Sequence, residues 1–185
     1  MPGFTFVFLQ RNRAVAAQVR VRRAGREELE RAYSIRLRVF VREQGVRREI
    51  ELDGDDRSAT HLVAELGGQI VGTARVVIKR DQAKIGRMAV LRGYRGKGVG
   101  KELLKRAVAL AKRRGAKGIF LHAQVPVIPF YEKMGFHCVG RVFLEAGIPH
   151  RKMVVYGVRG RKCGVGGPNG NRTRVTDVRG RCPNR

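Results

Sequence analysis

The chain has 185 residues, 43% of them hydrophobic, which is enough to bury the core of one globular domain. No apolar run approaches the roughly 20 residues that a membrane-spanning helix needs, and the opening "MPGFTFVFLQ" lacks the basic start of a signal peptide. We therefore expect a cytoplasmic protein with no membrane partner. The formal net charge of +25 allows nucleic-acid binding, but the basic residues are spread along the chain like a solvated surface, so nucleic acid is not expected as the main partner.

Three segments are expected along the chain. Residues 1–17 form an N-terminal extension, and residues 18–157 form the folded domain. Residues 158–185 form a basic tail that we expect to be disordered, because it holds almost no apolar residue larger than valine. Cys163 and Cys182 fall in this tail, while Cys138 lies in an apolar stretch and is expected to be a buried thiol. Neither a metal-ligand spacing nor a disulfide framework is present, so no metal is expected.

The first half of the domain predicts a strand, a helix and a hairpin. "VRVRRA" (19–24) is typical of a strand, and the apolar residues from Arg26 to Gln44 recur at helical spacing. Residues 47–61 are predicted to be an acidic loop. Two apolar strands, 61–66 and 70–78, are separated by a glycine turn and predict a hairpin.

The second half predicts a strand over 84–91, a glycine-rich loop and a helix from Val99 to Arg114, with one apolar stripe and a stop at Gly115. A buried-type strand (117–125), a short helix (128–136) and a second hairpin (137–145 with 150–158) follow. This order predicts a mixed sheet with helices on its faces, in the α/β to α+β range.

The glycine-rich loop "RGYRGKGVGKELL" begins at Arg92 and runs into the predicted helix. Such a loop can hold a phosphate, because unpaired N–H groups and the positive helix end point at the anion. A nucleoside-triphosphate loop would need glycine at Arg95 and a hydroxyl residue at Glu102, and a dinucleotide loop would need glycine at Lys101. Both are excluded. The remaining pattern, [RQ]-x-x-G-x-[GA], fits residues 95–100.

With this loop between the strand "IGRMAVL" and a helix, the chain resembles the GNAT superfamily of acyl-CoA-dependent N-acyltransferases. "FYEKMGF" (130–136) resembles the motif of the helix after the family's fifth strand. "EAGIPHRKM" (145–153) and "VFVREQGV…ELDGDD" (39–56) are similar to the ElaA-like branch, and the resemblance covers about residues 19–157. It implies a mixed, mostly antiparallel sheet with helices on both faces and a splayed central strand pair.

The resemblance also implies that acetyl-CoA is the co-substrate and that the loop binds its pyrophosphate. Backbone groups of the strand before the loop would pair with the pantetheine arm, and Gln124 stands near the position where many members carry a coenzyme-contacting asparagine. The implied coenzyme-binding residues are Met88, Ala89, Val90, Arg95, Gly96, Lys97, Gly98, Val99, Gly100, Gln124 and Phe130.

The resemblance implies two catalytic candidates, Tyr131 and Glu43, and the strand pattern adds a third, His122. Tyr131 would protonate the departing thiolate, with a half-buried core tyrosine as the alternative. His122, on the same strand face as Gln124, is a candidate general base or a structural histidine. Glu43 would hold a water that deprotonates the amine, or is a solvated loop acid. The position where many relatives place a glutamate base corresponds to Gly86.

The sequence therefore predicts an N-acetyltransferase that moves an acetyl group from acetyl-CoA to a primary amine by direct attack in a ternary complex. Asp53, in the acidic segment, is a candidate for attracting a cationic acceptor. The alternative is a basic module that binds RNA or ribosomes on a catalytically silent acetyltransferase fold. Polyamine, aminoglycoside, amino acid and protein N-terminus stay open as acceptors, as do acyl chain length and oligomeric state, because these motifs do not specify them.

Overall fold

The computed structural model describes residues 18–155. The expected extension (1–17) and basic tail (158–185), with Cys163 and Cys182, lie outside the described residues. Within the described part of the chain, no helix combines the length and the apolarity needed to cross a membrane.

The elements occur in the predicted order. The strands are β1 (Arg20–Arg23), β2 (Thr60–Leu66), β3 (Gln69–Lys79), β4 (Gln82–Val90), β5 (Gly118–Gln124), β6 (Phe136–Glu145) and β7 (Ile148–Val155). The α-helices are α1 (Arg26–Arg36), α2 (Arg48–Glu51), α3 (Val99–Arg113) and α4 (Ile128–Glu132). A π-helical segment, η1 (Leu37–Glu43), continues α1, and the 3₁₀ turns are η2 (Gly54–Arg57), η3 (Arg92–Tyr94) and η4 (Val125–Val127).

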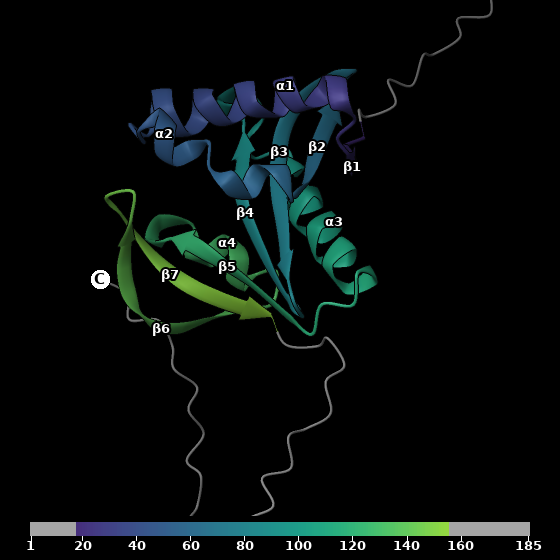
Figure 1. The fold of residues 1–185 in the computed structure, drawn as a ribbon. Helices are drawn as coiled ribbons and strands as arrows, with labels where there is room; N and C mark the ends of the chain where they lie inside the picture. The colour runs from purple at the N-terminus through teal and green to yellow at the C-terminus, as the bar shows by residue number, and fades with distance from the viewer. Residues whose placement is uncertain (1–17, 156–185) are drawn as a thin grey trace, which may run out of the picture.

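The strands form one seven-stranded sheet in the order β1-β2-β3-β4-β5-β7-β6. Every neighbouring pair is antiparallel except β4 and β5, which are parallel. Figure 1 shows α1 and α2 along one side of the N-terminal strands and α3 along the other. The predicted fold, a mostly antiparallel mixed sheet with helices on both faces, is confirmed.

Helix α3 is anchored to the sheet by the apolar stripe that the sequence predicted. Its buried side chains are Val99, Leu103, Leu104, Ala107, Leu110 and Ala111. Burying a valine or leucine side chain fully stabilises the fold by about 1.5–3 kcal/mol. The stripe therefore fixes the start of α3, and with it the glycine-rich loop, against the end of β4.

Strands β4 and β5 share only a short stretch of pairing. Residues 82–85 pair with 118–121, and beyond Ile85 and Leu121 the two strands diverge (Figure 1). A β-bulge marks the point of divergence: the register with β3 shifts by one extra residue between Gly86 and Ala89, and Arg87 has a positive φ of 49°. Because a bulge bends and twists its strand, β4 turns away from β5 and opens a cleft between them.

The predicted loop at 47–61 is more ordered than its composition indicated. It contains the one-turn helix α2 and the turn η2, and Glu51 is only 2% exposed. The carboxylates of this segment are paired with arginines from distant elements, which local composition cannot reveal.

Candidate active site

A cavity of about 730 Å³ follows the cleft between β4 and β5. It runs from the glycine-rich loop at one end to His122, Glu145 and His150 at the other. The sequence-predicted residues that line it are Met88, Ala89, Val90, Arg95, Gly96, Gly98, Val99, Gly100, His122, Gln124, Phe130 and Tyr131. Lys97, Glu43 and Asp53 are outside the lining, although each lies beside residues that belong to it.

The glycine-rich loop has the backbone shape of an anion site. Gly96 and Gly98 have φ values of 77° and 81°, and Gly98 caps the N-terminus of α3. A side chain in this left-handed region costs roughly 1–2 kcal/mol, which explains the need for glycine. The N–H groups of the first turn of α3 have no carbonyl within the helix to bind and can bind a phosphate.

Arg95 ties this loop to its surroundings. Its Nε donates to the carbonyl of Val90 at 3.0 Å, and its Nη2 donates to Glu43 at 2.5 Å. Lys97 lies 5.2 Å from the ring centroid of Tyr94. The structure therefore brings Glu43 to the phosphate end of the cavity, beside Arg95, rather than to the polar end.

Residues 88–90 belong to the diverging part of β4. One edge of this stretch pairs with β3, with Ala89 opposite Thr73, while the other edge faces the cleft because β5 has turned away. An extended ligand arm can therefore add to β4 as a further strand would. At the mouth of the cleft, Nε2 of Gln124 donates to Gln44, at the end of η1, at 2.9 Å.

Tyr131 lies in the cavity wall, on α4. The residue is 9% exposed, and the centroid of its ring lies 4.9 Å from that of Phe130 and 6.2 Å from that of Phe136. Burial raises the pKa of its hydroxyl to about 12, so the phenol is protonated at neutral pH. The arrangement supplies one buried proton donor beside the diverging strand.

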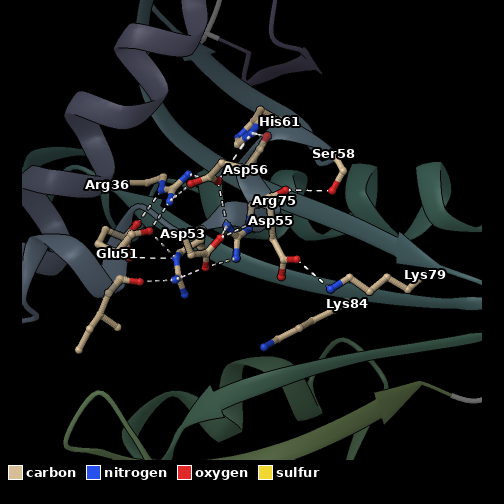
Figure 2. Close-up of polar contacts among 12 residues, drawn as sticks. Arg36, Glu51, Asp53, Asp55, Asp56, Ser58, His61, Arg75, Lys79 and Lys84 are labelled. Carbon is tan, nitrogen blue, oxygen red and sulfur yellow. Dashed lines mark hydrogen bonds and ion pairs between the residues drawn. The ribbon is translucent and has the colours of Figure 1, made fainter.

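The acidic segment is joined to Arg36, Arg75 and Arg87, and Figure 2 shows the first two beside their carboxylate partners. The fully buried guanidinium of Arg36 donates to Glu51 at 2.5 Å and to both oxygens of Asp56, at 2.7 and 3.0 Å. Burial alone would raise the pKa of Asp56, but hydrogen bonds from Arg36 and Arg75 outweigh it and lower the pKa to about 2. Asp56 is therefore ionised, while burial raises the pKa of Glu51 despite its hydrogen bond from Arg36.

Asp53 accepts hydrogen bonds from two arginines that line the cavity. Arg75 donates to both of its oxygens, at 2.5 and 3.0 Å, and Arg87 donates at 2.8 Å. Arg87 also donates to the carbonyl of Ile50 at 2.9 Å, which fastens the bulge of β4 to α2. Asp53 itself does not line the cavity, but the two arginines that it binds do.

The polar end of the cavity holds residues to which sequence reasoning gave no role. Nδ1 of His122 lies 2.7 Å from Oε2 of Glu145, and Lys84 and His150 line the same end. Glu145 and His150 both lie in "EAGIPHRKM", so the motif contained the signal. Their contact with His122 could not be inferred, because it depends on how the β6–β7 hairpin pairs with β5. Among residues 18–155 no cluster of three or more potential metal ligands occurs.

Comparisons with known proteins agree with this geometry. A family model described as an acetyltransferase (GNAT) domain matches residues 22–156. The uncharacterized N-acetyltransferase YjcF of Bacillus subtilis is 38% identical over 129 residues, 69% of this chain and 92% of YjcF. The crystal structure of Escherichia coli ElaA superimposes with a TM-score of 0.65 at 27% identity, over 75% of this chain and 99% of that chain.

A further structure shares the fold alone. It is a GNAT family acetyltransferase from Elizabethkingia anophelis with acetyl-CoA bound, with a TM-score of 0.57 at 18% identity over 74% of this chain and 94% of that chain. The family model covers all the strands and helices that form the cleft except the first residues of β1. The chain therefore belongs to the GNAT acetyltransferase family.

Proposed function

We propose that this protein transfers an acetyl group from acetyl-CoA to a primary amine by direct attack in a ternary complex. One observation carries the proposal: a single cavity joins the phosphate-type loop, the open edge of β4 and the buried phenol of Tyr131. These are the parts that a thioester donor with a phosphate-bearing tail needs, in the order in which such a molecule would present them.

The donor end of the cavity fits coenzyme A. The loop offers backbone N–H groups at the start of α3, and Arg95 and Lys97 add positive charge beside them. Each charge-assisted hydrogen bond contributes ~1.5–3 kcal/mol, and the helix dipole contributes ~0.3–1 kcal/mol. The acetyl-CoA bound to the Elizabethkingia protein, which shares the fold, supports the same donor here.

Tyr131 acts as the general acid in this proposal. As the amine nitrogen bonds to the acetyl carbon, backbone N–H groups polarise the carbonyl and the phenol gives its proton to the sulfur. A pKa of about 12 keeps the phenol protonated until that moment. Burial in the same cavity also raises the pKa of the departing thiol, so this pKa comes closer to that of the phenol and the proton transfer becomes less unfavourable.

The acceptor enters at the polar end. In the acidic segment, the carboxyl groups of Glu51, Asp53 and Asp56 are paired with the guanidinium groups of Arg36, Arg75 and Arg87. A net pull on a cation from this cluster is therefore small. A contribution of Asp53 to acceptor binding stays a prediction, exerted through Arg75 and Arg87.

The test combines donor binding with an acceptor panel. Isothermal titration should show that acetyl-CoA binds, and release of free thiol should then identify an acceptor among spermidine, kanamycin, glycine and an alanine-initiated peptide. A nonspecific oligonucleotide is titrated in parallel at physiological salt. Salt-sensitive oligonucleotide binding without acetyl-CoA binding would contradict the proposal and favour the nucleic-acid module.

A further inference from the structure

Glu145 occupies a bridging position at the polar end of the cavity. It is the last residue of β6, at the turn that joins β6 to β7 (Figure 1). One carboxylate oxygen lies 2.7 Å from Nδ1 of His122 on β5, and the other lies 3.6 Å from Nζ of Lys84 on β4. The carboxylate thus touches both strands near the point where they diverge.

The contact with Glu145 determines which nitrogen of His122 carries the proton. An ionised carboxylate can only accept hydrogen bonds, so Nδ1 must donate and Nε2 keeps the lone pair. The ring is held on its sides by Phe143 and Phe120, with centroid distances of 4.8 and 5.9 Å. His122 lines the cavity, and its orientation therefore offers a fixed basic nitrogen there.

His122 also stands at the right place along the cleft. The pairing of β4 with β5 ends at Leu121, so His122 is the first residue of β5 beyond the divergence. Across from it is Gly86, beside which no atom lies within 4 Å of a β-carbon position. The opposite strand therefore leaves space for an acceptor amine beside the imidazole.

We propose that Glu145 is a positioning residue that holds His122 as the general base for the acceptor amine. This rests on the proposed function, because it concerns the proton of the acceptor in that reaction. Two independent features carry it: the carboxylate–imidazole hydrogen bond and the location of His122 at the divergence of the strands.

The protons balance as follows. An ammonium acceptor gives one proton to Nε2 of His122, and the resulting imidazolium is stabilised by Glu145. The nitrogen lone pair then forms the bond to the acetyl carbon while the carbon–sulfur bond breaks, and Tyr131 protonates the sulfur. The second nitrogen proton restores Tyr131, and the first is released from His122 to solvent. No oxidant or other co-reactant is needed.

The electrostatics favour a neutral imidazole at rest. The groups that face His122 are Glu145 from β6, Lys84 from β4 and His150 from β7, while Lys152, its neighbour in β7, lies over the ring of Phe120. Burial lowers the pKa of His122, and Lys84 and His150 lower it further, against the hydrogen bond to Glu145, which raises it. The imidazole is therefore able to accept a proton near neutral pH.

Two opposite substitutions test the proposal. Glu145→Gln removes the group that raises the pKa of His122, so the acidic limb of the kcat–pH profile should move to lower pH. Lys84→Met removes a group that lowers it, so the same limb should move to higher pH. We expect kcat to fall about 10–100-fold in Glu145→Gln, the range known for carboxylates that orient metal-bound histidines, and by about 10²–10⁴-fold in His122→Ala.

The assay uses full-length protein, acetyl-CoA and the panel amine that wild type acetylates fastest. Acetyl-CoA affinity, measured by titration, should be unchanged in all three variants, because none of these residues lies in the phosphate loop. If acetyl-CoA fails to bind wild type, the proposed function itself is wrong. If it binds and turns over but His122→Ala keeps the acidic limb, only the present inference is wrong.

A spectroscopic measurement does not depend on turnover. Long-range ¹H–¹⁵N spectra of the free protein should show His122 as the Nδ1–H tautomer in wild type and as a mixture in Glu145→Gln. A wild-type Nε2–H tautomer would overturn the assignment. An unchanged tautomer in Glu145→Gln would show that Glu145 does not position the ring.

Discussion

The hydroxyl oxygen of Tyr131 lies 3.8 Å from the sulfur of Met88, so the phenol of α4 meets the diverging part of β4 across the cavity. These two elements are more than 40 positions apart in the sequence. Their contact places a proton donor beside the strand edge along which the thioester is proposed to lie.

Replacing Tyr131 with Phe removes the proton donor and keeps the ring. We expect turnover to fall by about 10²-fold, the low end of general acid catalysis, because a thiolate is a fairly good leaving group. Acetyl-CoA affinity and thermal stability should change little, since the ring still packs against Phe130 and Phe136. Wild-type turnover under conditions where chemistry limits the rate would show that Tyr131 is a packing residue.

The phosphate loop is tested by Gly98→Leu. A leucine at φ 81° is strained, and its side chain would occupy the approach to the start of α3, so the dissociation constant for acetyl-CoA should rise at least tenfold. The matched control is Gly93→Leu in η3, where a β-carbon meets no atom within 4 Å and φ is ordinary. Circular dichroism should show both variants folded. Normal binding by Gly98→Leu would remove the loop from the coenzyme site.

Because Arg87 has a positive φ at the bulge, we expect glycine to be tolerated better than alanine at this position. Arg87→Ala loses the hydrogen bonds to Ile50, Glu51 and Asp53 and keeps a side chain at φ 49°. Arg87→Gly loses the same bonds but relieves the strain. Although glycine has more entropy to lose on folding, Arg87→Gly should be the more stable of the two by ~1 kcal/mol. Urea unfolding of both variants measures this difference, and the reverse order would contradict a strained bulge.

Asp56 predicts a loss of stability in acid. Its pKa falls from the ordinary 3.8 to about 2 in the folded protein, because hydrogen bonds from Arg36 and Arg75 outweigh the effect of burial. A depressed carboxyl pKa contributes stability that is full above about pH 4 and is lost as the pH falls towards 2. We expect about 1 kcal/mol of the free energy of unfolding to be lost through this residue between pH 6 and pH 3.

The measurement compares urea unfolding at pH 6 and pH 3 in wild type, Asp56→Asn and Asp81→Asn. Asp56→Asn should be less stable at pH 6 and should lose about 1 kcal/mol less on acidification. The exposed Asp81 serves as a control and should leave the wild-type pH dependence intact. If the free energy of unfolding falls equally between pH 6 and pH 3 in wild type and in Asp56→Asn, the arginines do not stabilise the ionised form of Asp56.

The sequence by itself determined the order of the elements, the amphipathic face of α3 and the loop that begins it. These are local properties. The spacing of apolar residues indicates which face of a helix is buried, and a backbone position with positive φ favours glycine whatever the rest of the fold. Motif residues such as Tyr131 and Gly98 could therefore be placed from the sequence alone, together with the family resemblance that the comparisons confirm.

Only the tertiary structure decided how the charged residues are used. The carboxylates of the acidic segment meet Arg36, Arg75 and Arg87 because three elements converge there, and sequence spacing contains no record of that convergence. The contact between His122 and Glu145 likewise depends on the pairing of the β6–β7 hairpin with β5. Burial of the apolar face of a strand fixes its register with the neighbouring strands. That register then determines which polar side chains on the other face lie beside one another.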